Sequence, residues 1–208
     1  FGIWISMFIT WVLTGCIVVF ILLMPGFVGG VLGFSPFETT YFQMGGLVCI
    51  VSSCWLTGRL ADKHNPSTLC ILFSAGFAVS SVAFFSLLYT AAPVVSEVVL
   101  AYFATCFFAG IMNFCPIFMC DVFPARIRFS GISFAYNIAY ALSGAFTPQL
   151  SFALHAYAKT HPDTLGAMGL SAYIVFLALV SIGTALAMRR VYKNGGAAVS
   201  QMEFRPAP

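Results

Sequence analysis

The chain has 208 residues, of which 61% are hydrophobic and 7% are charged, with a mean hydropathy of +0.98 and a formal net charge of +3. A soluble domain carries roughly 25% charged residues, so this composition excludes a water-covered globular fold and predicts an integral membrane protein. The small basic excess lies in short loops, where it acts as a topology signal and does not indicate nucleic-acid binding.

Six apolar stretches follow one another along the chain, each close to the roughly 20 residues that cross a bilayer core. They cover residues 3–24, 39–57, 69–89, 98–120, 129–154 and 169–188, and none contains Asp, Glu, Lys or Arg. The first begins almost at Phe1 without a basic segment before it, so we interpret it as a spanning helix and not a signal peptide. We also expect the chain to be a piece of a longer protein.

The pattern predicts an all-α, six-helix transmembrane bundle over residues 1–193, because only helices satisfy every backbone polar group within lipid. The longest connections are expected at 25–38, which is rich in Gly and Pro, and at 155–168. A polar tail at 194–208 is expected to be disordered.

The basic residues predict how the bundle is oriented. Eight of the nine Lys and Arg residues follow the even-numbered spans: Arg59, Lys63, Arg126, Arg128, Arg189, Arg190, Lys193 and Arg205. Only Lys159 lies on the other side, so the positive-inside rule predicts that both ends of the chain are cytoplasmic.

Cysteine and histidine give no metal or redox signature. No Cys-x-x-Cys pair occurs, and no His stands at ligand spacing from a Cys. We interpret the cysteines as small packing residues and expect neither a metal nor a cofactor. The seven are Cys16, Cys49, Cys54, Cys70, Cys106, Cys115 and Cys120.

A transport path requires polar side chains that point inward at mid-depth of a membrane bundle. The span at 129–154 has a polar stripe at helical steps of three or four, formed by Ser130, Ser133, Asn137, Tyr140, Gly144, Pro148 and Ser151. Across all spans the best candidates for substrate contact are Gln43, Asn113, Asn137 and Tyr140. The alternative for the same residues is hydrogen bonding between helices.

Charged residues gather in two of the predicted cytoplasmic loops. We predict that six of them form a gate whose bonds are made in one conformation and broken in another: Arg59, Asp62, Lys63, Asp121, Arg126 and Arg128. In that interpretation Asp62 faces the positive end of the helix that begins near Phe129. The alternative is that these residues serve only to orient the bundle.

These loops resemble those of the major facilitator superfamily of transporters. The loop after the second span matches the superfamily pattern at Gly58, Leu60, Ala61, Asp62 and Lys63. The stretch from the fourth to the fifth span is similar to that of the metabolite–proton symporters, the group of proline/betaine, shikimate, citrate and α-ketoglutarate carriers. It matches at Asp121, Phe123, Pro124, Arg128, Ser130, Gly131, Tyr136, Asn137, Gly144 and Pro148.

The resemblance implies that the chain is the C-terminal half, helices seven to twelve, of a twelve-helix carrier. It implies proton-coupled transport of a small polar metabolite by alternating access, in partnership with an N-terminal six-helix half, in a plasma membrane that we expect to be a bacterial inner membrane. No acidic residue or His lies within a span, so the proton site is expected in the other half.

Four positions depart from the family pattern. Phe129 replaces the usual Tyr, Asn65 replaces a Gly, and Pro66 and Ser67 replace two arginines, which removes two positive charges from the loop. The Pro-Glu-Thr-Lys-Gly sequence of sugar porters does not follow the last span.

Other classes of membrane protein fit less well. An aquaporin-like channel needs two Asn-Pro-Ala half-helices, whereas the only Asn-Pro is Asn65-Pro66. A rhomboid-like protease needs Gly-x-Ser-Gly and a His within a span, and neither occurs. We therefore do not expect an enzyme. A truncated, non-transporting six-helix protein remains the main alternative.

Overall fold

The computed structural model describes residues 2–90, 92–161 and 165–193, and regular structure within these ranges is entirely helical. The helices form six long runs joined by short connections. The first run comprises Gly2–Ile17 (α1), Val18–Leu23 (η1, a π-helix) and Met24–Leu32 (α2). The second and third are Pro36–Ala61 (α3) and Pro66–Leu88 (α4). The fourth comprises Val95–Phe108 (α5), Ala109–Asn113 (η2, a 3₁₀ helix) and Phe114–Val122 (α6), and the last two are Ala125–Thr160 (α7) and Leu165–Lys193 (α8).

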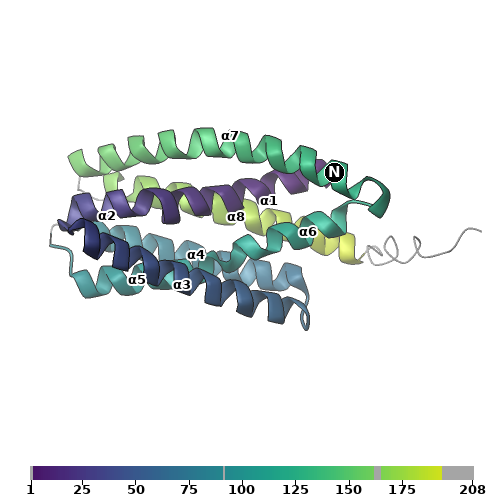
Figure 1. Cartoon of the computed structure of the whole chain (residues 1–208), viewed down its shortest axis with the longest axis horizontal. Helices are drawn as coiled ribbons and strands as arrows, with labels where there is room; N and C mark the ends of the chain where they lie inside the picture. The colour runs from purple at the N-terminus through teal and green to yellow at the C-terminus, as the bar shows by residue number, and fades with distance from the viewer. Residues whose placement is uncertain (1, 91, 162–164, 194–208) are drawn as a thin grey trace, which may run out of the picture.

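The six runs lie side by side along one axis (Figure 1). α1 packs against α7, α8 and α6, whereas α3 packs against α5 and η2, and α4 packs along both α5 and α8. α7 and α3 therefore lie on opposite sides of the bundle, with the other helices between them. The start of α1 and the end of α8 meet at the same end of the bundle.

Short polar signals set several helix ends. Ser35 and Glu38 form a reciprocal capping box at the start of α3, with the Ser35 amide donating to Glu38 Oε2 at 2.8 Å. Asn65 caps α4 by accepting the Ser67 amide at 2.9 Å. Gly33 ends α2 with φ of 69°, a left-handed conformation that glycine adopts without steric cost.

Aromatic side chains dominate the core where the first run meets α4 and α5. Phe20 lies with its ring centroid 5.5 Å from that of Phe77 and 6.1 Å from that of Phe85. Tyr102 stacks on Phe42 at 4.1 Å and is 1% exposed. Contacts between aromatic rings thus join four of the six runs, which fixes α3 and α5 against the first run.

Five of the runs are long and apolar enough to cross a membrane. They are Gly2–Leu32, Pro36–Ala61, Pro66–Leu88, Val95–Val122 and Met168–Lys193. Each contains one of the predicted spans to within a residue, so the all-α, membrane-type architecture is as expected. The predicted span at 129–154 coincides with α7, which is long but less apolar than the other five. That α7 crosses the membrane stays a prediction.

Two predicted connections are shorter than expected. The first run continues as α2 to Leu32, so most of the segment 25–38 is helix despite Pro25. Likewise α7 runs to Thr160 and α8 begins at Leu165, leaving little of the predicted connection at 155–168. The predicted tail at 194–208 lies outside the described residues.

Candidate substrate path and charged end

The first run is interrupted by the π-helix η1, which is followed closely by Pro25. This residue has no N–H for Ile21 O, four residues earlier, and in the π-helical register of η1 it cannot serve Phe20 O either. Side chains of other helices supply the missing donors: Gln43 Nε2 donates to Ile21 O at 2.7 Å, and the Tyr102 hydroxyl donates to Phe20 O at 2.9 Å. The structure therefore places the amide nitrogen of Gln43, a predicted substrate contact, on the backbone of the first run.

The fourth run is broken at η2, where Asn113 connects it to α3. Asn113 Nδ2 donates to Cys54 O at 3.1 Å and to Thr57 Oγ1 at 3.2 Å. The two elements approach closely here, because a Cβ atom on Gly110 would lie 2.1 Å from Ser53 Oγ. The second predicted substrate contact thus lies in a tight junction between α3 and η2.

The other two predicted contacts lie on the exposed side of α7. Asn137 is exposed, and its amide nitrogen donates to Ser133 O of the same helix at 2.7 Å. Tyr140 is 43% exposed and stacks on Tyr136 with ring centroids 5.6 Å apart. Their polar atoms therefore remain accessible from outside this bundle, unlike those of Gln43 and Asn113.

The opposite side of α7 is buried and carries a polar network that we did not predict. Thr147 Oγ1 lies 2.7 Å from the Tyr173 hydroxyl and 3.3 Å from Ser143 Oγ. Trp11 Nε1 donates to the same tyrosine oxygen at 3.4 Å, and Ser143 donates to Trp11 O at 3.4 Å. The network joins α1, α7 and α8.

An apolar groove of about 360 Å³ borders the half-buried Tyr136 of α7. It runs between α1, α6 and α7, and its lining includes Leu13, Cys115, Pro116, Cys120, Ile132 and Tyr136. The groove has the shape and polarity to accept an apolar moiety beside the aromatic pair formed by Tyr136 and Tyr140.

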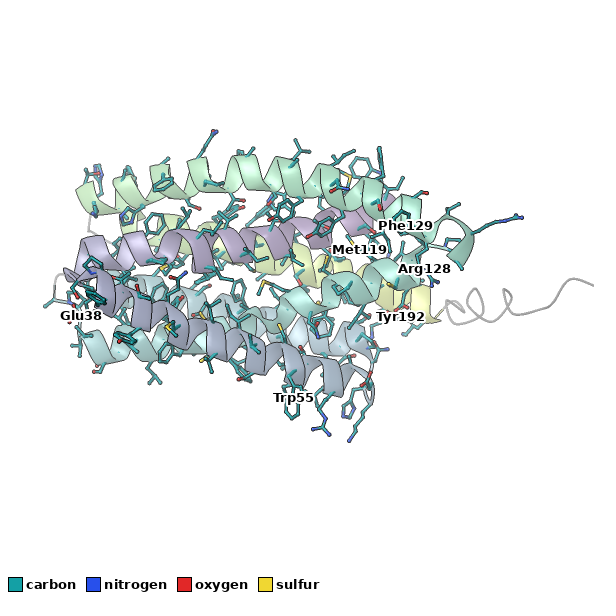
Figure 2. The ribbon with its side chains drawn as sticks, in the orientation of Figure 1. Glu38, Trp55, Met119, Arg128, Phe129 and Tyr192 are labelled. Atoms are coloured by element: carbon teal, nitrogen blue, oxygen red, sulfur yellow. The ribbon has the colours of Figure 1, made fainter. Side chains whose placement is uncertain are left out.

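The six predicted gate residues lie at one end of the bundle but on different sides of it. The Arg59 guanidinium lies 4.7 Å from the ring centroid of Trp55 at the end of α3. Arg128 Nε donates to Phe123 O at 3.1 Å, in the turn before α7. Figure 2 shows Trp55 and Arg128 on opposite sides of this end.

The acidic gate residues also have partners other than the predicted ones. The hydroxyl of Tyr192 on α8, labelled in Figure 2, donates to Asp121 Oδ2 at 2.5 Å. Asp62 caps the end of α3, across the bundle from α7, so the expected pairing of Asp62 with the start of α7 does not form within this chain. Lys63 and Arg126 are exposed. Within the described residues, none of the six forms an ion pair with another.

At the opposite end, an aromatic cluster surrounds His155. Its ring stacks on Phe27 at 4.1 Å, and its Nδ1 lies 2.5 Å from the Tyr89 hydroxyl. The cluster ties α2, α4 and α7 together where α4 ends.

Several of these polar contacts were not predicted from the sequence. Tyr102 and Tyr173 sit in apolar spans, and nothing in the local pattern identifies their partners, which lie 82 and 162 residues away in the chain. One signal was available for the α7 network: Ser143, Thr147 and Ser151 recur every four residues, which places them on one side of a helix.

Comparison of the chain with protein-family models, curated proteins and solved structures found no match.

Proposed function

We propose that this chain is the C-terminal six-helix half of a major facilitator superfamily carrier, of the metabolite–proton symporter group. In this proposal the complete carrier transports a small polar metabolite, such as an organic acid, an amino acid or a betaine-type osmolyte, and couples it to protons. It acts by alternating access in a plasma membrane, and the ends of this half are cytoplasmic.

The observation that carries the proposal is a pair of polar residues, Asn137 and Tyr140, among the exposed and otherwise mainly apolar residues of α7. Asn137 and Tyr140 face outward from the bundle, whereas Ser143 and Thr147 of the same helix are buried and hydrogen-bonded. Polar side chains are unfavourable against lipid, and in membrane helices they face a partner bundle or a water-filled cavity. A second bundle that encloses a cavity against α7 would provide that environment.

The two broken runs give further support. η1 interrupts the first run and η2 interrupts the fourth, both close to a proline. Discontinuous helices in transporters commonly form the substrate site, because they free backbone groups within the membrane. Here α1 and α6, which flank these breaks, also line the groove beside Tyr136.

The charged end fits a gate that closes between two bundles. Asp62 and Arg128 do not meet within this chain, so in the proposal each finds its partner on the other half. Bonds made across the interface in only one conformation would then shift the equilibrium between the two states.

The test is solute uptake by the complete gene product. The longest reading frame that contains these 208 residues would be expressed, purified and reconstituted into vesicles with an inward proton gradient. We expect uptake of at least one labelled organic acid, amino acid or betaine, and we expect a protonophore to abolish it. Uptake no greater than in protein-free vesicles for every solute would contradict the proposal.

A pair of α7 variants tests the role of the polar side. Asn137→Ala should lower uptake about tenfold or more, which corresponds to roughly 1.4 kcal/mol. Gln149→Ala is the matched control, because Gln149 is an exposed amide on the same helix that points away from Asn137. Equal uptake by the two variants would remove Asn137 from the path.

A further inference from the structure

A second apolar groove, of about 390 Å³, lies between the start of α1 and the second half of α8. Its walls include Trp4 and Phe8 from α1 and Val180, Gly183 and Ala187 from α8. It is separate from the groove beside Tyr136, since the two share no lining residue.

The groove is open along its length. Trp4 is 64% exposed and Phe8 is 49% exposed, and their rings stack with centroids 6.3 Å apart. On the other wall a Cβ atom added to Gly183 would meet nothing within 4 Å. The wall at Gly183 therefore leaves open space beside the exposed rings of Trp4 and Phe8.

Arg190 is the basic residue of α8 nearest to the lining of this groove, with Lys193 three residues further along the same side of the helix. Arg190 follows Gly183 by seven residues and Ala187 by three, so it continues the side of α8 that borders the groove. It is exposed, and within the described part of the chain it has no ion-pair or hydrogen-bond partner. Its neighbour Arg189 lies about 100° further around the helix and does not continue this side.

We propose that this groove binds an anionic phospholipid, with one acyl chain along Trp4 and Gly183 and the phosphate on Arg190. α1 and α8 belong to two of the runs that are long and apolar enough to span a membrane, so lipid is the medium that surrounds their outer sides. Tryptophan is enriched at the level of lipid headgroups, and basic residues beside grooves between helices attract anionic headgroups.

The positive charge of Arg190 determines which class of phospholipid the groove prefers. An apolar groove alone would accept the acyl chain of any phospholipid, whereas the unpaired guanidinium of Arg190 favours a headgroup with net negative charge. One basic residue near an anionic surface changes affinity about fivefold. The inference does not depend on transport, because it rests only on the outer side of α1 and α8.

The experiment uses the fluorescence of Trp4. Trp11 and Trp55 would be replaced by Phe in the full 208-residue chain, leaving Trp4 as the only tryptophan, and the protein would be reconstituted in phosphatidylcholine. Brominated phosphatidylglycerol or brominated phosphatidylcholine would then be added in increasing fractions. We expect half-maximal quenching at an about fivefold lower fraction of the anionic lipid.

Two pairs of variants localise the effect. Arg190→Gln should make the two lipids equivalent, whereas Arg189→Gln, with the same charge change one residue away, should keep the preference. Gly183→Leu should fill the groove and reduce quenching by both lipids. Its control is Gly144→Leu on α7, where an added Cβ also meets nothing within 4 Å.

Three results would overturn the proposal. The first is equal quenching by both lipids in the parent protein, which is also expected if another part of the chain fills the groove. The second is loss of preference in Arg189→Gln to the same extent as in Arg190→Gln, which would indicate a diffuse charge effect. The third is unchanged quenching in Gly183→Leu. Circular dichroism of each variant would confirm that helix content is preserved.

Discussion

The two broken runs differ in how their interruptions are stabilised. In the first run, Pro25 removes backbone donors, and Gln43 and Tyr102 reach in from other helices to replace them. In the fourth run the side chain belongs to the break itself, because Asn113 of η2 reaches out to Cys54 O of the unbroken α3. The interrupted first run therefore accepts hydrogen bonds from its neighbours, whereas the interrupted fourth run donates one to its neighbour.

This difference indicates which polar side chains are needed to satisfy a backbone carbonyl. The carbonyls of Ile21 and Phe20 lack their usual donors because of Pro25, so removing Gln43 or Tyr102 would leave a buried acceptor unsatisfied. Cys54 O lies in the regular part of α3, where a backbone donor is available. The amide of Asn113 adds a second bond there, and its removal should cost less.

The largest expected effect concerns the contact of η2 with α3. Gly110→Val should lower the free energy of unfolding by about 3 kcal/mol, because the added atoms would collide with Ser53 Oγ and crowd Thr57. Gly144→Val is the control, because it removes the same backbone flexibility without causing a collision. The free energy of SDS-induced unfolding should therefore fall more in Gly110→Val than in Gly144→Val. Equal destabilisation would show that the contact is not tight.

The next effect concerns Tyr102. Tyr102→Phe keeps the ring against Phe42 but leaves Phe20 O without its side-chain donor. We expect a loss of about 1–3 kcal/mol, the cost of an unsatisfied buried group. The same unfolding assay applies, with Tyr41→Phe, an exposed tyrosine of α3, as the neutral control. A loss no larger than the control's would mean that Phe20 O has another donor.

A double-mutant cycle tests the compensation between Pro25 and Gln43. Gln43→Met, which keeps the side-chain length, should cost about 1 kcal/mol in the parent chain. In a Pro25→Ala background the restored N–H can serve Ile21 O, so the same substitution should cost at least about 0.5 kcal/mol less. Strictly additive effects would show that proline does not create the need for Gln43.

The smallest effect is expected at Asn113. Asn113→Leu should cost only about 0.6 kcal/mol, the average for a hydrogen bond between membrane helices. The comparison with Gln43→Met under identical conditions is the decisive measurement. If Asn113→Leu proved the more damaging of the two, the proposed distinction between the breaks would be reversed.

Much of the fold followed from the sequence, because hydropathy and charge act locally along a chain. Each predicted span lies within one helical run to within a residue, and the connection at 62–65 lies inside the expected interval between the second and third spans. The extent of the first run was wrong: proline and glycine suggested a loop after Pro25, whereas side chains from α3 and α5 satisfy the carbonyls that the proline leaves free. Such compensation depends on neighbours distant in sequence.

The candidate site was less predictable than the fold. A polar residue in an apolar span can face a substrate or another helix, and the sequence does not distinguish these cases. Gln43 and Asn113 donate to backbone groups of neighbouring helices, whereas Asn137 and Tyr140 lie on an open side. The assignment of a path and of a gate stays a prediction, because both need surfaces that meet groups outside the described bundle.

The length of α7 has a mechanical consequence. Its 36 residues extend about 54 Å, whereas a hydrocarbon core measures about 30 Å. Arg126 and Lys159, near its two ends, are separated by almost that full length. If α7 spans the bilayer, it can rise or tilt by a turn without drawing either charge into lipid, whereas α4, with 23 residues, has no such reserve. Of the two helices, α7 is therefore the one whose length exceeds the hydrocarbon core by several turns.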